Sequence, residues 1–182
     1  QDINKMMTSY FKDEDDDIYI IGKDFYEIGG SEYLSRIHNL IKGNPPNIDL
    51  DTEKSLHNYV LELIETGLIK SAHDISDGGF AVALAECCIM DKQKSIGCEV
   101  NIISEARKDF VLFSESQSRV IISSAKENRH RILSLANKYN QKIELIGKTG
   151  GPSVKINDCI DLSLDNIFES YFNTIRKLMN EK

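Results

Sequence analysis

The chain has 182 residues, of which 41% are hydrophobic and 28% are charged, a balance typical of one globular domain with a single core. The formal net charge of −7 argues against a nucleic-acid-binding protein, which normally has a basic face, and no apolar run is long enough to span a membrane. The cysteines contain no Cys-x-x-Cys pair, so we expect no zinc site, and reduced thiols in a cytoplasmic protein: Cys87, Cys88, Cys98 and Cys159.

The first 16 residues are polar and run into an acidic stretch, residues 13–17. We expect residues 1–16 to form a tail or linker and residues 17–182 to form a single domain. A solvated charge run explains the acidic stretch better than a cation site does. The chain begins with Gln1 rather than Met, which we interpret as the mark of a fragment or a processed protein.

Residues 18–21 are β-branched or aromatic without interruption, which predicts a buried strand. After Gly29 and Gly30, apolar residues at helical spacing from 34 to 41 predict a helix with Ser31 as N-cap and an end near Gly43. A loop at residues 44–47 leads to a long helix that begins near Asp51.

Residues 71–90 form the most informative stretch. A short strand enters a polar turn, and the apolar run that follows has Glu86 as its only charge, which predicts a buried helix. Ser76 or Asp77 is the expected N-cap. Because a helix N-terminus beside glycines can hold an anion, this turn is a candidate phosphate or substrate cradle, although a capped core helix explains the same pattern.

The two Gly-Gly turns, at Gly29-Gly30 and Gly78-Gly79, each open a predicted helix. Two such starts are able to converge on one anionic ligand, and two unrelated tight turns are the alternative interpretation.

A half-buried strand is predicted at residues 97–102, and further strands at 110–113 and 120–122. The polar residues 114–119 between the last two strands are either a substrate contact or a hairpin turn whose groups bond one another.

Ser124 and Glu127 have the spacing of a capping box, which predicts a helix that ends near Tyr139. A strand at 143–147 is expected to pair with residues 153–156 across a glycine turn, and a single amphipathic helix with a basic end at Lys182 follows. This order predicts an α/β (α+β) fold: a mixed sheet flanked by helices and partly ferredoxin-like.

Familiar catalytic motifs are missing from the sequence. It contains no Walker-type phosphate loop, no Gly-x-Ser-x-Gly elbow and no pair of histidines with metal-ligand spacing. The pattern is therefore more typical of part of an active site than of a complete one, and we assign no catalytic residue.

Three blocks in the chain resemble the C-terminal domain of the phosphoribosylformylglycinamidine synthase family. These blocks are EIGGSEY at 27–33, SAHDISDGG at 71–79 and FSESQSR at 113–119. The resemblance extends over nearly the whole chain from about Asp17, and its strength lies in all three blocks occurring in order. Ser114 stands where the family often has glycine.

The resemblance implies the fold of the C-terminal domain of enzymes similar to aminoimidazole ribonucleotide synthetase. In this family ATP phosphorylates the amide oxygen of formylglycinamide ribonucleotide, and glutamine-derived ammonia displaces the phosphate through an iminophosphate. It also implies that the partners are N-terminal ATP-handling domains and a glutaminase domain or subunit, that ATP and Mg²⁺ are bound mainly outside this chain, and that this piece is inactive alone.

Matching positions give the candidate substrate or phosphate contacts, with no metal ligand among them: Gly29, Gly30, Ser31, His73, Asp74, Ser76, Asp77, Gly78, Gly79, Glu115, Ser116 and Gln117. Two alternatives remain open from the sequence. One is the equivalent domain of a superfamily relative, such as selenophosphate synthetase, thiamine-monophosphate kinase or a hydrogenase-maturation protein. The other is a structural module with a degenerate site.

Overall fold

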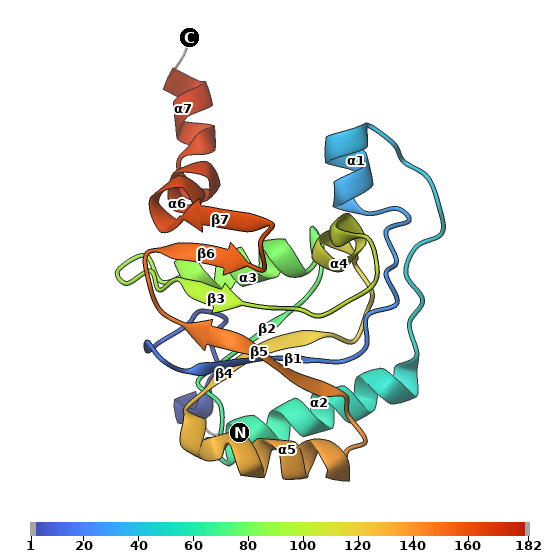
Figure 1. Cartoon of the computed structure of the whole chain (residues 1–182), viewed down its shortest axis with the longest axis vertical. Coiled ribbons are helices and arrows are strands. Elements are labelled where there is room, and N and C mark those ends of the chain that lie inside the picture. Colours follow the sequence, from blue (N-terminus) through green and yellow to red (C-terminus); the bar gives the residue numbers. More distant parts are fainter. Residues whose placement is uncertain (1–2, 181–182) are drawn as a thin grey trace.

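A computed structural model describes residues 3–180. Its seven strands form one mixed sheet in the order β2-β4-β1-β5-β3-β6-β7, which curls between two layers of helices (Figure 1). The strands are β1 (Asp17–Ile21), β2 (Ser71–Asp74), β3 (Cys98–Val100), β4 (Val120–Ser124), β5 (Ile143–Thr149), β6 (Ser153–Ile156) and β7 (Ile160–Ser163). The helices are α1 (Glu32–His38), α2 (Leu50–Glu65), α3 (Gly79–Ile89), α4 (Lys108–Phe113), α5 (Arg129–Lys138), α6 (Leu164–Phe172) and α7 (Thr174–Asn180), with 3₁₀ turns at Ile3–Lys5 and Lys126–Asn128.

Each face of the sheet has its own hydrophobic core. On one face α3 lies at the centre, and α4 and α6 pack beside it. On the other face α2 and α5 pack together through side chains such as Tyr59 and Ile132, which are fully buried. The predictions of an α/β fold with a mixed sheet and of a buried helix after the second Gly-Gly turn are confirmed.

The pairing predicted for residues 153–156 is wrong. β6 pairs in parallel with β3 and antiparallel with β7, and β3 separates it from β5. The reason lies at Gly97, because a Cβ there would be 2.5 Å from the Gly151 carbonyl oxygen. Because Gly97 and Gly151 approach closely, the residues that lead into β3 lie against the turn between β5 and β6. β3 therefore separates the two strands, and this turn does not close a hairpin.

Residues 110–113, predicted as a strand, belong to helix α4. Short apolar runs do not distinguish a strand from a buried helical turn, and here one side of the run packs on α3.

The capping box predicted at Ser124 and Glu127 is also wrong. Ser124 ends β4, and its buried hydroxyl donates to the Leu68 carbonyl at 2.7 Å. A 3₁₀ turn follows it, and α5 begins only at Arg129.

Two predicted helices are shorter than expected. α1 has the predicted N-cap, Ser31, but it ends at His38 because Asn39 adopts the left-handed conformation that closes a helix. The C-terminal helix is interrupted at Asn173, which divides it into α6 and α7. Lys182, the expected basic end, lies outside the described residues.

The acidic stretch is not simply solvated. Asp17 is fully buried and accepts hydrogen bonds from Arg129 at 2.8–3.0 Å, and Asp16 bonds Lys70 at 2.8 Å. Phe11, within the segment expected to be a tail, is 1% exposed in the core of α3. Phe11, Asp16 and Asp17 therefore pack onto the domain, while residues 13–15 between them stay exposed.

From residue 3 to residue 180, none of the helices combines the length and the apolar character needed to cross a membrane.

Candidate functional site

The three sequence blocks meet at the carboxylate of Glu115. Its Oε1 accepts a hydrogen bond from the backbone N–H of Gly78 at 2.8 Å and another from the N–H of Glu32 at 2.9 Å. Glu115 is only 9% exposed. We call this arrangement of Glu115, Gly78 and Glu32 the glutamate junction. The two helix starts converge on one anion, as the paired Gly-Gly turns suggested, and that anion is a side chain of the protein.

The first block reaches the junction through the N-terminus of α1. The Ser31 hydroxyl accepts from the Leu34 N–H at 3.3 Å, which fixes the first turn and aims the Glu32 N–H outward from the helix. Tyr33 stacks on Phe113 with ring centroids 4.8 Å apart, so α1 is held against α4 (Figure 1). Gly29 lies against the Asn44 backbone, where a Cβ would be 2.2 Å from the carbonyl oxygen.

The second block comes so close to the third that it requires glycine. Gly79 has φ +71°, and a Cβ on it would be 2.6 Å from the Phe113 carbonyl carbon. Gly78 is the N-cap of α3, in the left-handed conformation and without a side-chain cap. The prediction of Ser76 or Asp77 as N-cap is therefore wrong, because the turn ends one residue later and the Glu115 carboxylate supplies the capping acceptor.

The third block is fixed in place by a buried ion pair between Arg119 and Asp24. The Arg119 side chain is 1% exposed and bonds Asp24 at 2.7 Å and the Ser114 carbonyl at 2.7 Å. The Ser116 hydroxyl accepts from the Phe25 N–H at 3.2 Å. The interpretation of residues 114–119 as a hairpin turn whose groups bond one another is therefore only partly right. Arg119 bonds Ser114 within the turn, but a helix precedes the turn and further bonds reach Asp24 and Phe25.

Most backbone donors of the two glycine turns are already used. The N–H of Gly30 donates to the Lys42 carbonyl at 2.9 Å, and that of Gly79 to the Ser76 carbonyl at 3.0 Å. The Ser31 N–H donates to Ile28, also within the loop. The groups that face solvent next to the junction are Gly30, Ser76, Asp77 and Gln117. A ligand at this surface would therefore meet hydroxyl, carboxylate and amide side chains first.

His73 and Asp74 lie apart from the junction, at the end of β2. Nε2 of His73 donates to the Glu86 carboxylate at 3.1 Å, and His73 is among the residues that line a cavity of about 380 Å³ between α2 and β2. The hydrogen bond to Glu86 raises the pKa of His73 above 6.5, while burial opposes the rise. The sequence pattern singles out Glu86 only as the one charge on a buried helix. That unusual position was the available signal that Glu86 has a polar partner, which is His73.

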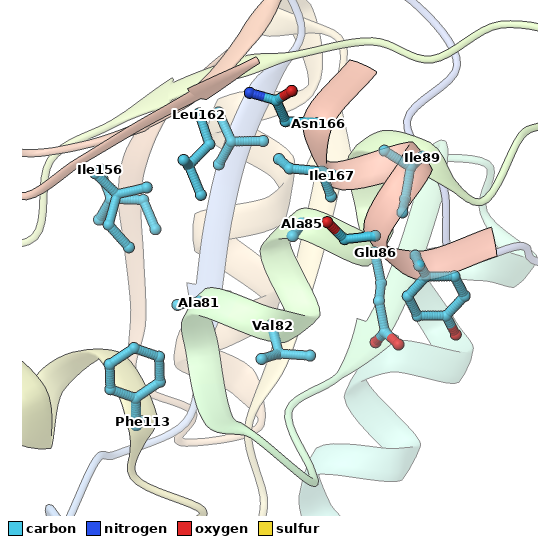
Figure 2. Close-up of a pocket in the computed structure, with 14 residues that line it drawn as sticks. Ala81, Val82, Ala85, Glu86, Ile89, Phe113, Ile156, Leu162, Asn166 and Ile167 are labelled. Atoms are coloured by element: carbon cyan, nitrogen blue, oxygen red, sulfur yellow. The ribbon is translucent and has the colours of Figure 1, made fainter. Parts of the chain in front are cut away.

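Two further cavities border these elements. One of about 600 Å³ is lined by Lys23, Phe25, Asn47 and Gln117 among others, beside the third block. The other is an apolar groove of about 460 Å³ between α3 and α6, where Glu86 is the only charged lining residue (Figure 2). Across residues 3–180 no three metal-binding side chains gather in a way that would hold a metal ion.

Comparison with known proteins places this geometry in a family. The family model described as AIR synthase related protein, C-terminal domain, matches residues 13–157. The phosphoribosylformylglycinamidine synthase subunit PurL of Moorella thermoacetica is 42% identical over 98% of this chain and 24% of its own length. The corresponding subunit of Anaeromyxobacter sp. strain Fw109-5 is 40% identical over 93% of this chain. The chain spans about a quarter of the length of these curated relatives.

Solved structures share the fold. T. maritima PurL complexed with FGAR aligns with a TM-score of 0.76 at 21% identity, over 91% of this chain and 30% of the other. A thiamine-monophosphate kinase from Stenotrophomonas maltophilia aligns with a TM-score of 0.52 at 18% identity, over 82% of this chain and 52% of the other.

Proposed function

The chain belongs to the family of AIR synthase related proteins, as their C-terminal domain, and on that premise we propose that it is the C-terminal module of a phosphoribosylformylglycinamidine synthase. The observation that carries the proposal is the identity of about 40% to synthase subunits, which extends over 98% of the chain. It therefore reaches beyond residues 13–157, the part that matches the family model. The thiamine-monophosphate kinase shares the fold at only 18% identity. This likeness gives no comparable support for the alternative that the chain belongs to such a kinase.

The proposed reaction converts an amide to an amidine. The terminal phosphoryl group of ATP is transferred to the amide oxygen of formylglycinamide ribonucleotide, ammonia from glutamine forms the new C–N bond, and phosphate leaves with that oxygen. ADP and phosphate are the by-products, so atoms and charge balance. Mg²⁺ would neutralise the phosphates of ATP, and we assign both to domains outside this chain, with a glutaminase as the ammonia source.

Within this scheme the chain binds and orients the substrate. The glutamate junction holds the three blocks in one rigid surface, and Ser76, Asp77 and Gln117 carry exposed polar groups within two residues of its bonded atoms. Hydroxyl, carboxylate and amide groups suit the ribose hydroxyls and amide of the substrate. We assign a structural role to Gly29, Gly30, Ser31, Gly78, Gly79, Glu115 and Ser116, and a substrate-facing role to His73 and Asp74.

The test is reconstitution in purified form. This chain is assayed alone, then mixed with the remainder of its parent protein, for ATP- and ammonia-dependent formation of formylglycinamidine ribonucleotide. We expect no activity from the chain alone and turnover in the mixture. Asp77→Ala or Gln117→Ala should then raise the KM for formylglycinamide ribonucleotide, while Asp15→Asn, an exposed acidic position in the N-terminal segment, should not.

Absence of this activity from a folded, associated mixture would contradict the proposal. The same mixture would then be assayed for phosphorylation of thiamine monophosphate and for selenophosphate formation.

We also propose a cytoplasmic location, in keeping with reduced, largely buried cysteines.

A further inference from the structure

The apolar groove between α3 and α6 has the shape of a surface that receives another surface. Several of the side chains that line it are exposed to solvent, among them Val82, Leu162 and Tyr171. On the α3 side the lining residues are the small Ala81 and Ala85, and larger apolar side chains of β6, β7 and α6 lie across from them (Figure 2). Such a groove accepts a ridge of apolar side chains, and an exposed apolar surface of this kind is typical of an interface.

The helix that follows the groove is exposed as well. α7 continues from α6 and stands away from the sheet (Figure 1), and its apolar residues Ile175, Leu178 and Met179 are all exposed. A helix of seven residues is not stable in water by its own hydrogen bonds. The α6–α7 side of the domain therefore requires a partner surface that residues 3–180 do not supply.

One end of the groove reaches the glutamate junction. Phe113, which lines the groove, belongs to the third block and stacks on Tyr33 of α1. Val82 lines the groove too, and a Cβ on Gly78 would lie 2.6 Å from Cγ2 of Val82. A body seated in the groove would therefore lie beside the groups that we assign to the substrate.

The part of the enzyme that lies outside this chain identifies the occupant. The chain spans about a quarter of the length of the synthase subunits that it matches, and its sequence lacks the common catalytic motifs. The groups that complete the site have to come from a body next to the junction, and the groove is an apolar surface that adjoins the junction. We propose that the groove between α3 and α6 is the docking surface for another domain of the same synthase polypeptide, which presents apolar side chains and a basic residue to it. The inference rests on the proposed function, which makes this chain one module of a longer polypeptide.

The charge of the groove explains the basic residue and argues against a second copy of this chain. Glu86 is the only charged residue that lines the groove, and its side chain is partly exposed there. A lysine or arginine at the edge of the apolar ridge would pair with this carboxylate and keep it satisfied after water is displaced. Two copies of this chain would each bring a net charge of −7, so they repel one another.

The experiment compares the accessibility of the groove in this chain and in the whole synthase polypeptide. Leu162→Cys places a thiol in the groove at a residue that is 49% exposed, and Leu133→Cys is the matched control on α5, 41% exposed on the other face of the sheet. Both are made with Cys159→Ser, which removes the exposed native thiol. Iodoacetamide labelling is located by peptide mass spectrometry, and far-UV circular dichroism checks that the variants are folded.

We expect both introduced thiols to react rapidly in this chain. In the whole polypeptide the thiol of Leu162→Cys should react at least about tenfold more slowly, while that of Leu133→Cys should stay within about twofold. Val82→Asp, which places a charge on the α3 side of the groove, should restore rapid labelling of Leu162→Cys in the whole polypeptide.

Equal labelling of Leu162→Cys in the chain and in the whole polypeptide would overturn the proposal. Protection that appears only after a glutaminase subunit is added would also overturn it, because the occupant would then be another subunit. Protection in this chain alone that rises with its concentration would identify a second copy as the occupant, with the same consequence. Labelling does not depend on turnover, so an inactive polypeptide that protects Leu162→Cys would refute the proposed reaction while supporting the docking surface.

Discussion

The backbone N–H of Gly78 donates a hydrogen bond of 2.8 Å to the carboxylate of Glu115, 37 residues further along the chain. The same carboxylate oxygen accepts from Glu32 at 2.9 Å, so one side chain binds the N-terminal ends of two helices. A fixed negative charge there is favourable because helix N-termini carry unpaired N–H groups and a partial positive charge. The junction is therefore a stabilising element as well as a neighbour of the proposed substrate surface.

Removing the Glu115 carboxylate should destabilise the domain. Glu115→Ala leaves two part-buried N–H groups without an acceptor and should lower the free energy of unfolding by about 3 kcal/mol. Glu115→Gln keeps an amide oxygen that can accept both bonds, so its loss should be about 1 kcal/mol. Urea unfolding followed by circular dichroism measures both values. Equal losses for the two variants would show that the hydrogen bonds are not the stabilising contribution.

Gly79→Ala tests the close approach of the second and third blocks. The added Cβ would lie 2.6 Å from the Phe113 carbonyl carbon, at a residue with φ +71°. Gly67→Ala is the matched control, with φ +66° and open space around the added atom. We expect the control to cost about 1 kcal/mol and Gly79→Ala at least about 3 kcal/mol, measured by urea unfolding. Similar costs would mean that backbone conformation alone requires glycine at residue 79.

Asp17→Asn tests the ion pair within the acidic segment. Asp17 is fully buried and bonds Arg129, whose side chain is 46% exposed and is able to turn to solvent once its partner is neutral. We therefore expect a loss of about 2 kcal/mol, below the usual range for a broken buried pair. The control Asp15→Asn removes a charge that is 83% exposed and 3.8 Å from Lys126, and should change stability by less than about 0.5 kcal/mol in the same urea assay. A comparable loss in the control would contradict a specific role for the Asp17–Arg129 pair.

Stability should depend on pH through His73. The hydrogen bond to Glu86 raises the His73 pKa above 6.5 in the folded state, so proton binding favours folding. This contribution is fully present below pH 6.5 and is lost as the pH rises through the raised pKa. Urea midpoints measured from about pH 5.5 to about pH 9 should fall with pH more steeply in the unmutated chain than in Glu86→Gln. Parallel curves would contradict this assignment.

Thiol labelling tests the protection of the cysteines by the core. Cys87, Cys88 and Cys98 are buried, and burial raises the pKa of the first two, whereas Cys159 is exposed. An aromatic disulfide reagent should therefore react rapidly with one thiol in the native chain and with all four in urea. Cys159→Ser should abolish the rapid phase, and a rapid phase that persists in this variant would show that α3 opens readily.

The sequence by itself determined the elements whose signal is local. The β-branched run of β1, the Ser31 cap of α1 and the almost entirely apolar α3 were predictable because strand and helix preferences act within a few residues. The three motif blocks were also visible in the sequence. Residues 110–113 and the Ser124 capping box were mispredicted because their conformation depends on α3 and on the Leu68 carbonyl.

Only the tertiary structure decided which groups meet. The sequence indicated two helix starts that favour an anion, but it could not show that Glu115 reaches both of them, because the bonded atoms lie 37 and 83 residues apart. In the same way, the order of β3, β5 and β6 depends on the contact between Gly97 and Gly151. Local preferences choose the elements, while long-range packing and the pairing of buried polar groups decide how those elements form a site.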